Sequence, residues 1–177
     1  PAGDVESLRG EHRRVEAMTL AANEETVLEG IQGNALEIVA EIAPRGAPMV
    51  EVDVLRSPNK VEFTRIAFFR ERGLRDRSRR GHHLSLVTIE SSYSSVLPDV
   101  RSRAPETAPV FIGRDETLKL RVFIDRSVVE VFVNGRQCVA QRIYPGREDS
   151  VGVSLRAQGQ DAELKSLDAW QMENIYE

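Results

Sequence analysis

Apolar and polar residues alternate along most of this chain in short segments, which is the pattern of antiparallel β-strands. The alternation is complete from Val50 to Val54, and the segments end at turn-forming residues such as Pro44 and Pro58. Strands are predicted at residues 35–42, 49–55, 61–69, 83–90, 118–124, 129–133, 137–144, 151–155 and 164–172. With no convincing long helix, the pattern predicts an all-β fold, a two-sheet antiparallel β-sandwich of the concanavalin A-like or jelly-roll type.

The first 25 residues follow a different pattern. They contain few apolar residues and a charge-dense stretch from Glu11 to Glu16. We therefore expect residues 1–25 to be a tether, with at most a helical turn, and residues 26–177 to be the sandwich domain. The chain begins with Pro1, and no signal-peptide pattern follows. We expect a fragment of a longer protein, so the sequence leaves its localisation open.

One hairpin is regular enough for its register to be predicted. Asn134-Gly135 is a strong type I′ turn signal, because both residues tolerate positive φ. A two-residue turn there places Val131 opposite Cys138. The preceding turn, Asp125-Arg126-Ser127-Val128, begins with an Asp that can bond its own backbone. The resulting core face consists of Leu120, Val122, Ile124, Val129, Val131, Val133, Cys138 and Ala140.

The other face of these strands is mixed in character. It carries Arg121, Phe123, Glu130, Phe132 and Val139, which are too apolar for full exposure and too charged for a dry core. We predict that something covers part of this face, around Arg121, Phe123 and Phe132. An ion pair between Arg121 and Glu130, diagonal neighbours in this register, is also predicted.

Composition and charge narrow the function classes. The 177 residues are 41% apolar and 29% charged, with mean hydropathy −0.34, values typical of one soluble globular domain. A net charge of −4 and the lack of a long apolar run argue against nucleic-acid and membrane partners. One cysteine and three histidines argue against a disulfide or a metal site, and nothing indicates a cofactor.

Candidate catalytic groups are weak. Asp125 and Glu130 are the most plausible carboxylate pair for glycoside hydrolysis, but we favour the interpretation of a turn-capping Asp and a solvent-facing Glu. Cys138 is predicted to lie among apolar side chains, where a thiol has a raised pKa and a structural role. We therefore expect no catalytic residue in this chain.

Three further features have a binding interpretation and a structural one. Residues 70–80 contain six arginines, typical either of an oxyanion site or of a solvated loop, and we favour the loop. Trp170 lies in an apolar strand and is predicted to be a core residue. Tyr93, Tyr144 and Tyr176 are scattered in the sequence, so no sugar-stacking platform is predicted.

A resemblance emerges from the hairpin region. The string from Leu118 to Gly135, LKLRVFIDRSVVEVFVNG, resembles the signature of the C-terminal β-sandwich of glycoside hydrolase family 32, the family of invertases, levanases, inulinases and sucrose-6-phosphate hydrolases. Matches also occur at residues 6–9, 33–38, 142–145, 151–153 and 167–172. The signature residues, for which the resemblance implies a structural role, are Asp125, Arg126, Ser127, Glu130, Phe132, Asn134, Gly135 and Trp170.

The resemblance implies a non-catalytic module that braces a catalytic β-propeller of the same polypeptide, in a parent that cleaves sucrose or fructans. The nearest strings to the family's catalytic motifs, such as Ser57-Pro58-Asn59 and Gln137-Cys138, do not match them. The chain also has residues 90–95, ESSYSS, where many relatives carry an Asp-Arg-Ser-like string. Homodimerisation, a weak carbohydrate contact and an independent fructan-binding module remain alternatives. The substrate-binding residues stay unknown, and so does the choice between hydrolase and transferase in the parent.

Overall fold

Side chains alternate between a buried and an outer side in the hairpin strands of the fold. In β9 (Leu118–Asp125) every second residue from Leu118 to Ile124 is buried, and β10 (Val128–Val133) repeats the pattern from Val129 to Val133. Since successive side chains of a strand point to opposite faces, these two strands offer one apolar side to a core.

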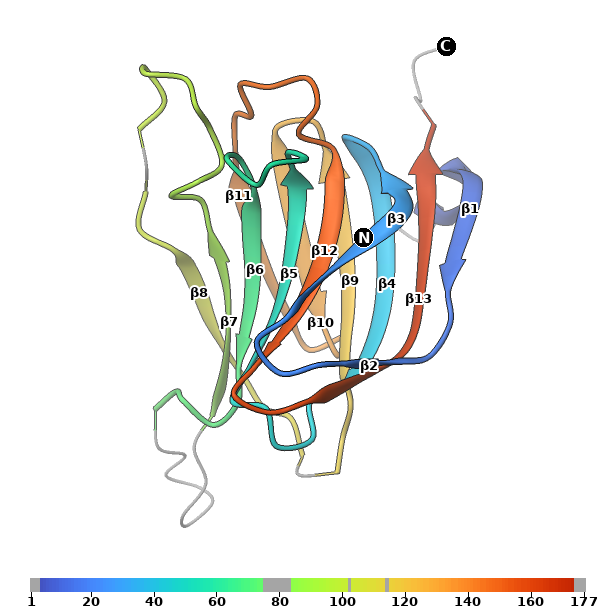
Figure 1. The fold of residues 1–177 in the computed structure, drawn as a ribbon, viewed down its shortest axis with the longest axis vertical. Helices are drawn as coiled ribbons and strands as arrows, with labels where there is room; N and C mark the ends of the chain where they lie inside the picture. The colour runs from blue at the N-terminus through green and yellow to red at the C-terminus, as the bar shows by residue number, and fades with distance from the viewer. Residues whose placement is uncertain (1–3, 75–83, 102, 114, 174–177) are drawn as a thin grey trace.

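The computed structural model describes residues 4–74, 84–101, 103–113 and 115–173, and it contains two antiparallel sheets packed face to face (Figure 1). Sheet A has the order β1-β13-β4-β9-β10-β11, with β2 also pairing β13. Its remaining strands are β1 (Arg9–Val15), β2 (Met18–Leu20), β4 (Ala35–Ala43), β11 (Gln137–Arg142) and β13 (Ala162–Met172). Sheet B consists of β3 (Glu25–Gln32), β12 (Gly152–Gln158), β5 (Met49–Arg56), β6 (Thr64–Phe69), β7 (Ser85–Glu90) and β8 (Glu106–Val110), in that order. The predicted two-sheet sandwich is confirmed.

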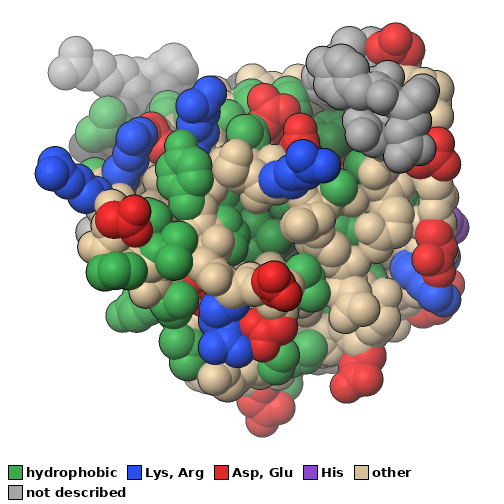
Figure 2. Space-filling view, turned by 90° about the horizontal axis from the view of Figure 1, so that it is seen from above, with side chains coloured by type: hydrophobic (Ala, Val, Ile, Leu, Met, Phe, Trp, Pro, Cys, Tyr) green, Lys and Arg blue, Asp and Glu red, His purple; other side chains and the backbone are tan. Residues whose placement is uncertain are grey.

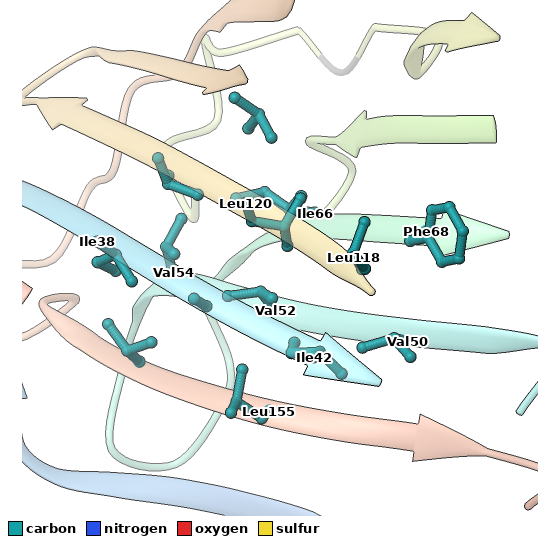
Figure 3. Close-up of a cluster of buried hydrophobic side chains, with 14 of the residues drawn as sticks. Ile38, Ile42, Val50, Val52, Val54, Ile66, Phe68, Leu118, Leu120 and Leu155 are labelled. Atoms are coloured by element: carbon teal, nitrogen blue, oxygen red, sulfur yellow. The ribbon is translucent and has the colours of Figure 1, made fainter. Parts of the chain in front are cut away.

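The core fills the space between the inner faces of the two sheets. Figure 3 shows Ile38, Ile42 and Leu120 of sheet A opposite Val52 and Leu155 of sheet B. All of them are almost completely buried. Burial of such side chains contributes about 1.5–3 kcal/mol each, so this interface is the main source of the domain's stability.

The prediction of a tether is wrong from Arg9 onward. The helical turn exists as the 3₁₀ helix η1 (Val5–Leu8), but β1 and β2 then pair with β13 and extend sheet A. The charged residues of β1 gave no apolar alternation because this strand is at the edge of the sheet, where charged side chains are solvated. The short β8 was also missed, because Pro109 weakens its strand signal.

The predicted hairpin is wrong by one residue. Asn134 and Gly135 do have positive φ, 48° and 63°, but Arg136 also belongs to the turn, and Val133 pairs with Gln137. The side chain of Asn134 accepts a hydrogen bond from the backbone of Lys119 at 2.9 Å, which ties the turn to β9. A shift of one residue exchanges the faces of a strand.

The shift relocates four residues of β11. Val139 and Gln141 are buried, whereas Cys138 and Ala140 are exposed on the outer side of sheet A. Cys138 is therefore not a core residue. The register predicted between β9 and β10 is confirmed, with Val131 opposite Val122.

Candidate functional site

The outer side of sheet A, which we call face A, brings aromatic and charged residues from four strands together. One row of side chains crosses β13, β4, β9 and β10 in that order. It consists of the successive Cα partners Trp170, Glu37, Phe123 and Glu130. The next row contains Asp168, Val39, Arg121, Phe132 and Cys138. Face A therefore includes the three residues for which a covered surface was predicted.

A buried carboxylate lies in the middle of face A. The Glu37 side chain is 0% exposed, although it points away from the core. Arg9 donates to both of its oxygens at 2.8 Å, through Nε and Nη2, and Arg121 Nε donates to Oε1 at 2.6 Å. Burial acts to raise the pKa of Glu37, but the hydrogen bonds from the two arginines outweigh it and lower that pKa. Glu37 is thus held as an anion between two cations.

Aromatic rings flank this ion network on both sides. The Arg9 guanidinium lies 4.0 Å from the centroid of the Trp170 ring, and the His12 ring stacks on that Trp at 4.9 Å. On the other side, Phe123 and Phe132 meet edge to face at 6.0 Å. Such aromatic and cation–π contacts fix the orientation of the side chains and leave apolar ring surface on the outside.

The segment that leads into the sandwich is attached to the same face. Glu6 in η1 lies 3.4 Å from Arg121 and 3.7 Å from Arg9. The backbone N–H of Glu173 donates to the carbonyl of Leu8 at 2.8 Å. The segment that enters the sandwich is therefore held by the same ion network that surrounds Glu37.

Two predictions about this face are corrected. Trp170 is half-buried on face A and is not a core residue, because a register shift in β13 between Leu164 and Ser166 turns Leu167 and Ala169 inward. Arg121 pairs with Glu37 and Glu6 rather than with Glu130, which lies opposite Phe123.

The sequence missed Glu37 and Arg9 as functional residues. The available signal was Glu37 itself, a charge inside the apolar run Ala35–Ile42. Its partner Arg9 was assigned to a tether, so the pair was not recognised.

The other signature residues lie in turns of sheet A. Arg126 and Ser127 form the turn between β9 and β10, and the N–H of Arg126 donates to the carbonyl of Asn34 at 2.7 Å. Asn134 and Gly135 form the next turn. Asp125 is exposed beside the first turn.

Among the described residues, neither Asp125 nor Glu130 forms a side-chain hydrogen bond or ion pair, and no group of three metal-ligating residues is found. Most of the arginine-rich segment, residues 75–80, lies outside the described residues. In the part of the chain that the structure describes, no helix is long and apolar enough to cross a membrane.

Comparison with known proteins gives consistent matches. The family described as glycosyl hydrolases family 32 C terminal matches residues 4–171. A levanase of Bacillus subtilis is 30% identical over 179 residues, and the match covers 99% of this chain and 24% of the levanase. The insoluble isoenzyme CWINV1 of β-fructofuranosidase from Arabidopsis thaliana is 32% identical over 67% of this chain and 20% of its own length.

Solved structures show the same fold. Fructan 1-exohydrolase IIa from Cichorium intybus superposes with a TM-score of 0.80 at 20% identity, over 98% of this chain and 37% of that one. An exo-inulinase from Aspergillus awamori superposes with a TM-score of 0.71 at 17% identity, over 96% and 31%. The chain thus spans between a fifth and two fifths of these proteins.

Proposed function

Because the chain belongs to the family of C-terminal domains of family 32 glycosyl hydrolases, we propose that it is the non-catalytic sandwich of an enzyme acting on sucrose or fructans and that it braces the catalytic domain of the same polypeptide. The named relatives, a levanase and a β-fructofuranosidase, support this substrate class. The small share of their length that the chain covers supports an additional catalytic part in the parent.

We further propose face A as the surface that contacts the catalytic domain. The observation that carries this proposal is the attachment of the entering segment to face A through Glu6, Arg9 and Arg121. A domain upstream in the chain is tethered there, so its effective concentration at face A is high. The partly buried rings of Phe123 and Phe132 supply apolar surface of the kind found in the centre of interfaces.

Substitution of Phe132 tests the docking surface. Phe132→Ser is introduced both in the 177-residue chain and in the full-length polypeptide, and unfolding is followed by calorimetry. We expect the loss in the full-length protein to exceed that in the isolated chain by about 1–2 kcal/mol, because the ring then also loses its contact with the catalytic domain.

Val27→Ser is the matched control, since Val27 is 46% exposed on β3 of sheet B. It should have the same small effect in both proteins. Equal effects of Phe132→Ser in both proteins would contradict docking through face A.

A further inference from the structure

At one end of the sandwich, a buried carboxylate links three loops by hydrogen bonds. Glu62, which is completely buried, accepts hydrogen bonds from the backbone N–H groups of Val96 at 2.8 Å, Gly146 at 2.7 Å and Arg147 at 3.1 Å, and from the Ser150 hydroxyl. These bonds tie the loop after β7 and the loop after β11 to the loop between β5 and β6. Figure 2 looks down on this end and shows hydrophobic side chains gathered on the left of the view, with Lys and Arg side chains beside them.

A shallow cleft with a cavity volume of about 20 Å³ lies between two of these loops, and its arginines are exposed, so a ligand would lie on the surface of this cleft. Its lining includes the guanidinium-bearing residues Arg101, Arg103 and Arg142, together with Ser91 and Tyr144. Its other lining residues are Ser94, Val100 and Ile143, so no carboxylate of a described residue lines it.

The three arginines have no partner in the described part of the chain. None of them forms an ion pair or a side-chain hydrogen bond with a described residue, unlike Arg9 and Arg121 on face A. Acidic residues close to the lining residues in sequence are Glu90, which accepts from the N–H of Ser92 at 2.7 Å, and the exposed Asp99 and Glu106, and none of them pairs with the three arginines. Positive charge at the cleft is therefore not neutralised by the lining residues.

A hydroxyl group adds a further donor. Gln141 Nε2 donates to Ser91 Oγ at 2.7 Å, so the Ser91 oxygen serves as acceptor and its own hydrogen remains free to donate. Several donors without a facing acceptor are suited to an oxyanion, and guanidinium groups bind phosphate in a bidentate manner.

Exposed tyrosines lie beside these donors. Tyr144 lines the cleft and is 45% exposed, and Tyr93, which precedes the lining residue Ser94, is 58% exposed. The Tyr93 ring stacks on Phe63 with centroids 5.2 Å apart, which fixes its orientation. Flat aromatic faces pack against the C–H side of sugar rings. The fold thus brings together tyrosines that are scattered in the sequence.

We propose that this cleft binds a sugar phosphate, with the phosphate group held by Arg101, Arg103 and Arg142 and the sugar ring placed against Tyr144. A neutral fructan leaves the three guanidinium charges without a counter-charge, whereas a phosphomonoester carries about −1.5 to −2 charge at neutral pH. The proposal concerns the end of the sandwich and does not depend on docking through face A.

Titration calorimetry of the 177-residue protein with fructose 6-phosphate, inorganic phosphate and fructose, at one ionic strength, tests the site. We expect saturable binding of fructose 6-phosphate to one site, weaker binding of inorganic phosphate and no heat with fructose. Arg142→Gln should weaken binding of fructose 6-phosphate by roughly tenfold, because a charge-assisted bidentate contact is lost.

Arg126→Gln is the control, because Arg126 is also exposed and without a described side-chain partner, but lies outside the cleft. It should leave the affinity unchanged. An equal loss of affinity for fructose 6-phosphate in the Arg142 and Arg126 variants would mean that any basic surface residue attracts the ligand. That result would overturn the proposal. So would the absence of binding.

Tyr144→Leu separates the role of the ring from that of the arginines. It should leave the affinity for inorganic phosphate unchanged and remove the preference for fructose 6-phosphate. An unchanged preference would overturn the placement of the sugar against Tyr144. Thermal melts of all variants, whose substituted side chains are exposed, check that each is folded.

Discussion

The outer faces of the two sheets differ in what occupies their centres. The centre of face A holds Trp170, Glu37 and Phe123, with aromatic rings on both sides of one carboxylate. The centre of the outer side of sheet B, face B, holds Ser154, Asp53 and Arg65 in one row. Aromatic surface at the centre favours contact with another protein surface, whereas Ser154 and Asp53 are almost completely buried and hydrogen-bonded to other polar groups of face B.

Asp53, at the centre of face B, is paired with two cations. Arg65 donates to both oxygens of Asp53, at 2.8 and 3.0 Å, and Lys60 Nζ lies 2.9 Å from Asp53. Apolar residues of this face, Met49, Phe69 and Leu86, form a row at one end of the sheet. Face B therefore has at its centre an ion network whose carboxylates, Asp53 and Glu51, are almost completely buried.

The difference between the two faces is clearest in the pKa values of two buried glutamates, one on each face. Glu37 on face A accepts from two arginines and has a lowered pKa. Glu51 on face B accepts from Gln158 at 2.8 Å, and its Oε1 lies 3.2 Å from Arg65, but its Oε2 has no hydrogen-bond partner and burial raises its pKa. Equal burial thus has opposite consequences, depending on how many donors reach the carboxylate.

The largest expected effect is that of Glu37→Gln. It should destabilise the protein by about 3 kcal/mol at neutral pH, because Arg9 and Arg121 lose their counter-charge in a partly buried site. Urea denaturation measures this difference. A loss no greater than that of Glu51→Gln would show that the Glu37 network contributes nothing special to face A.

Glu25 extends the comparison to acid pH. Hydrogen bonds from Arg56, Lys60 and Ser154 outweigh the opposing effect of burial and lower the pKa of Glu25 to about 2. A lowered pKa adds stability that is present above the ordinary value near 4.5 and is lost as pH falls towards about 2. Glu25→Gln should therefore cost about 2 kcal/mol at pH ~7, and the difference from the unaltered protein should shrink across this range.

Urea unfolding at a series of pH values measures this shrinking difference. A difference that stays constant from neutral to acid pH would mean that ionised Glu25 has no special contribution.

The smallest expected effect is that of Glu51→Gln. It should change stability by about 1 kcal/mol or less at neutral pH, since only one Glu51 oxygen is well bonded. The pH dependence should have the opposite sign. A raised pKa reduces the stability of the unaltered protein as pH rises above the ordinary value near 4.5, so the variant should gain relative to it. Relative stability that falls with rising pH would contradict this environment for Glu51.

The alternation of apolar and polar residues was sufficient to predict the sandwich and most of its strands, because this local pattern indicates which side of a strand is buried. The position of Trp170 was not predictable in the same way, since the register shift near Leu164 leaves no turn signal. Similarly, Asn134-Gly135 marked the turn, but the inclusion of Arg136 depends on contacts between Asn134 and β9.

The candidate sites depend on contacts between distant segments. Arg9 and Glu37 meet only because β1 joins sheet A through β13. Tyr93 and Tyr144 come to one end because Glu62 ties their loops together. Such contacts follow from the tertiary structure, and a single sequence carries no local signal for them.

The reactivity of Cys138 tests docking through face A most directly. Cys138 is exposed on face A opposite Phe132, and its thiol has a pKa raised by partial burial and then by Glu130. Its alkylation rate is measured by mass spectrometry of the Cys138 peptide, at one pH, in the isolated chain and in the full-length polypeptide. Docking through face A predicts alkylation that is slower by roughly tenfold or more in the full-length protein, because local opening must precede reaction. Equal rates in the two proteins would contradict it.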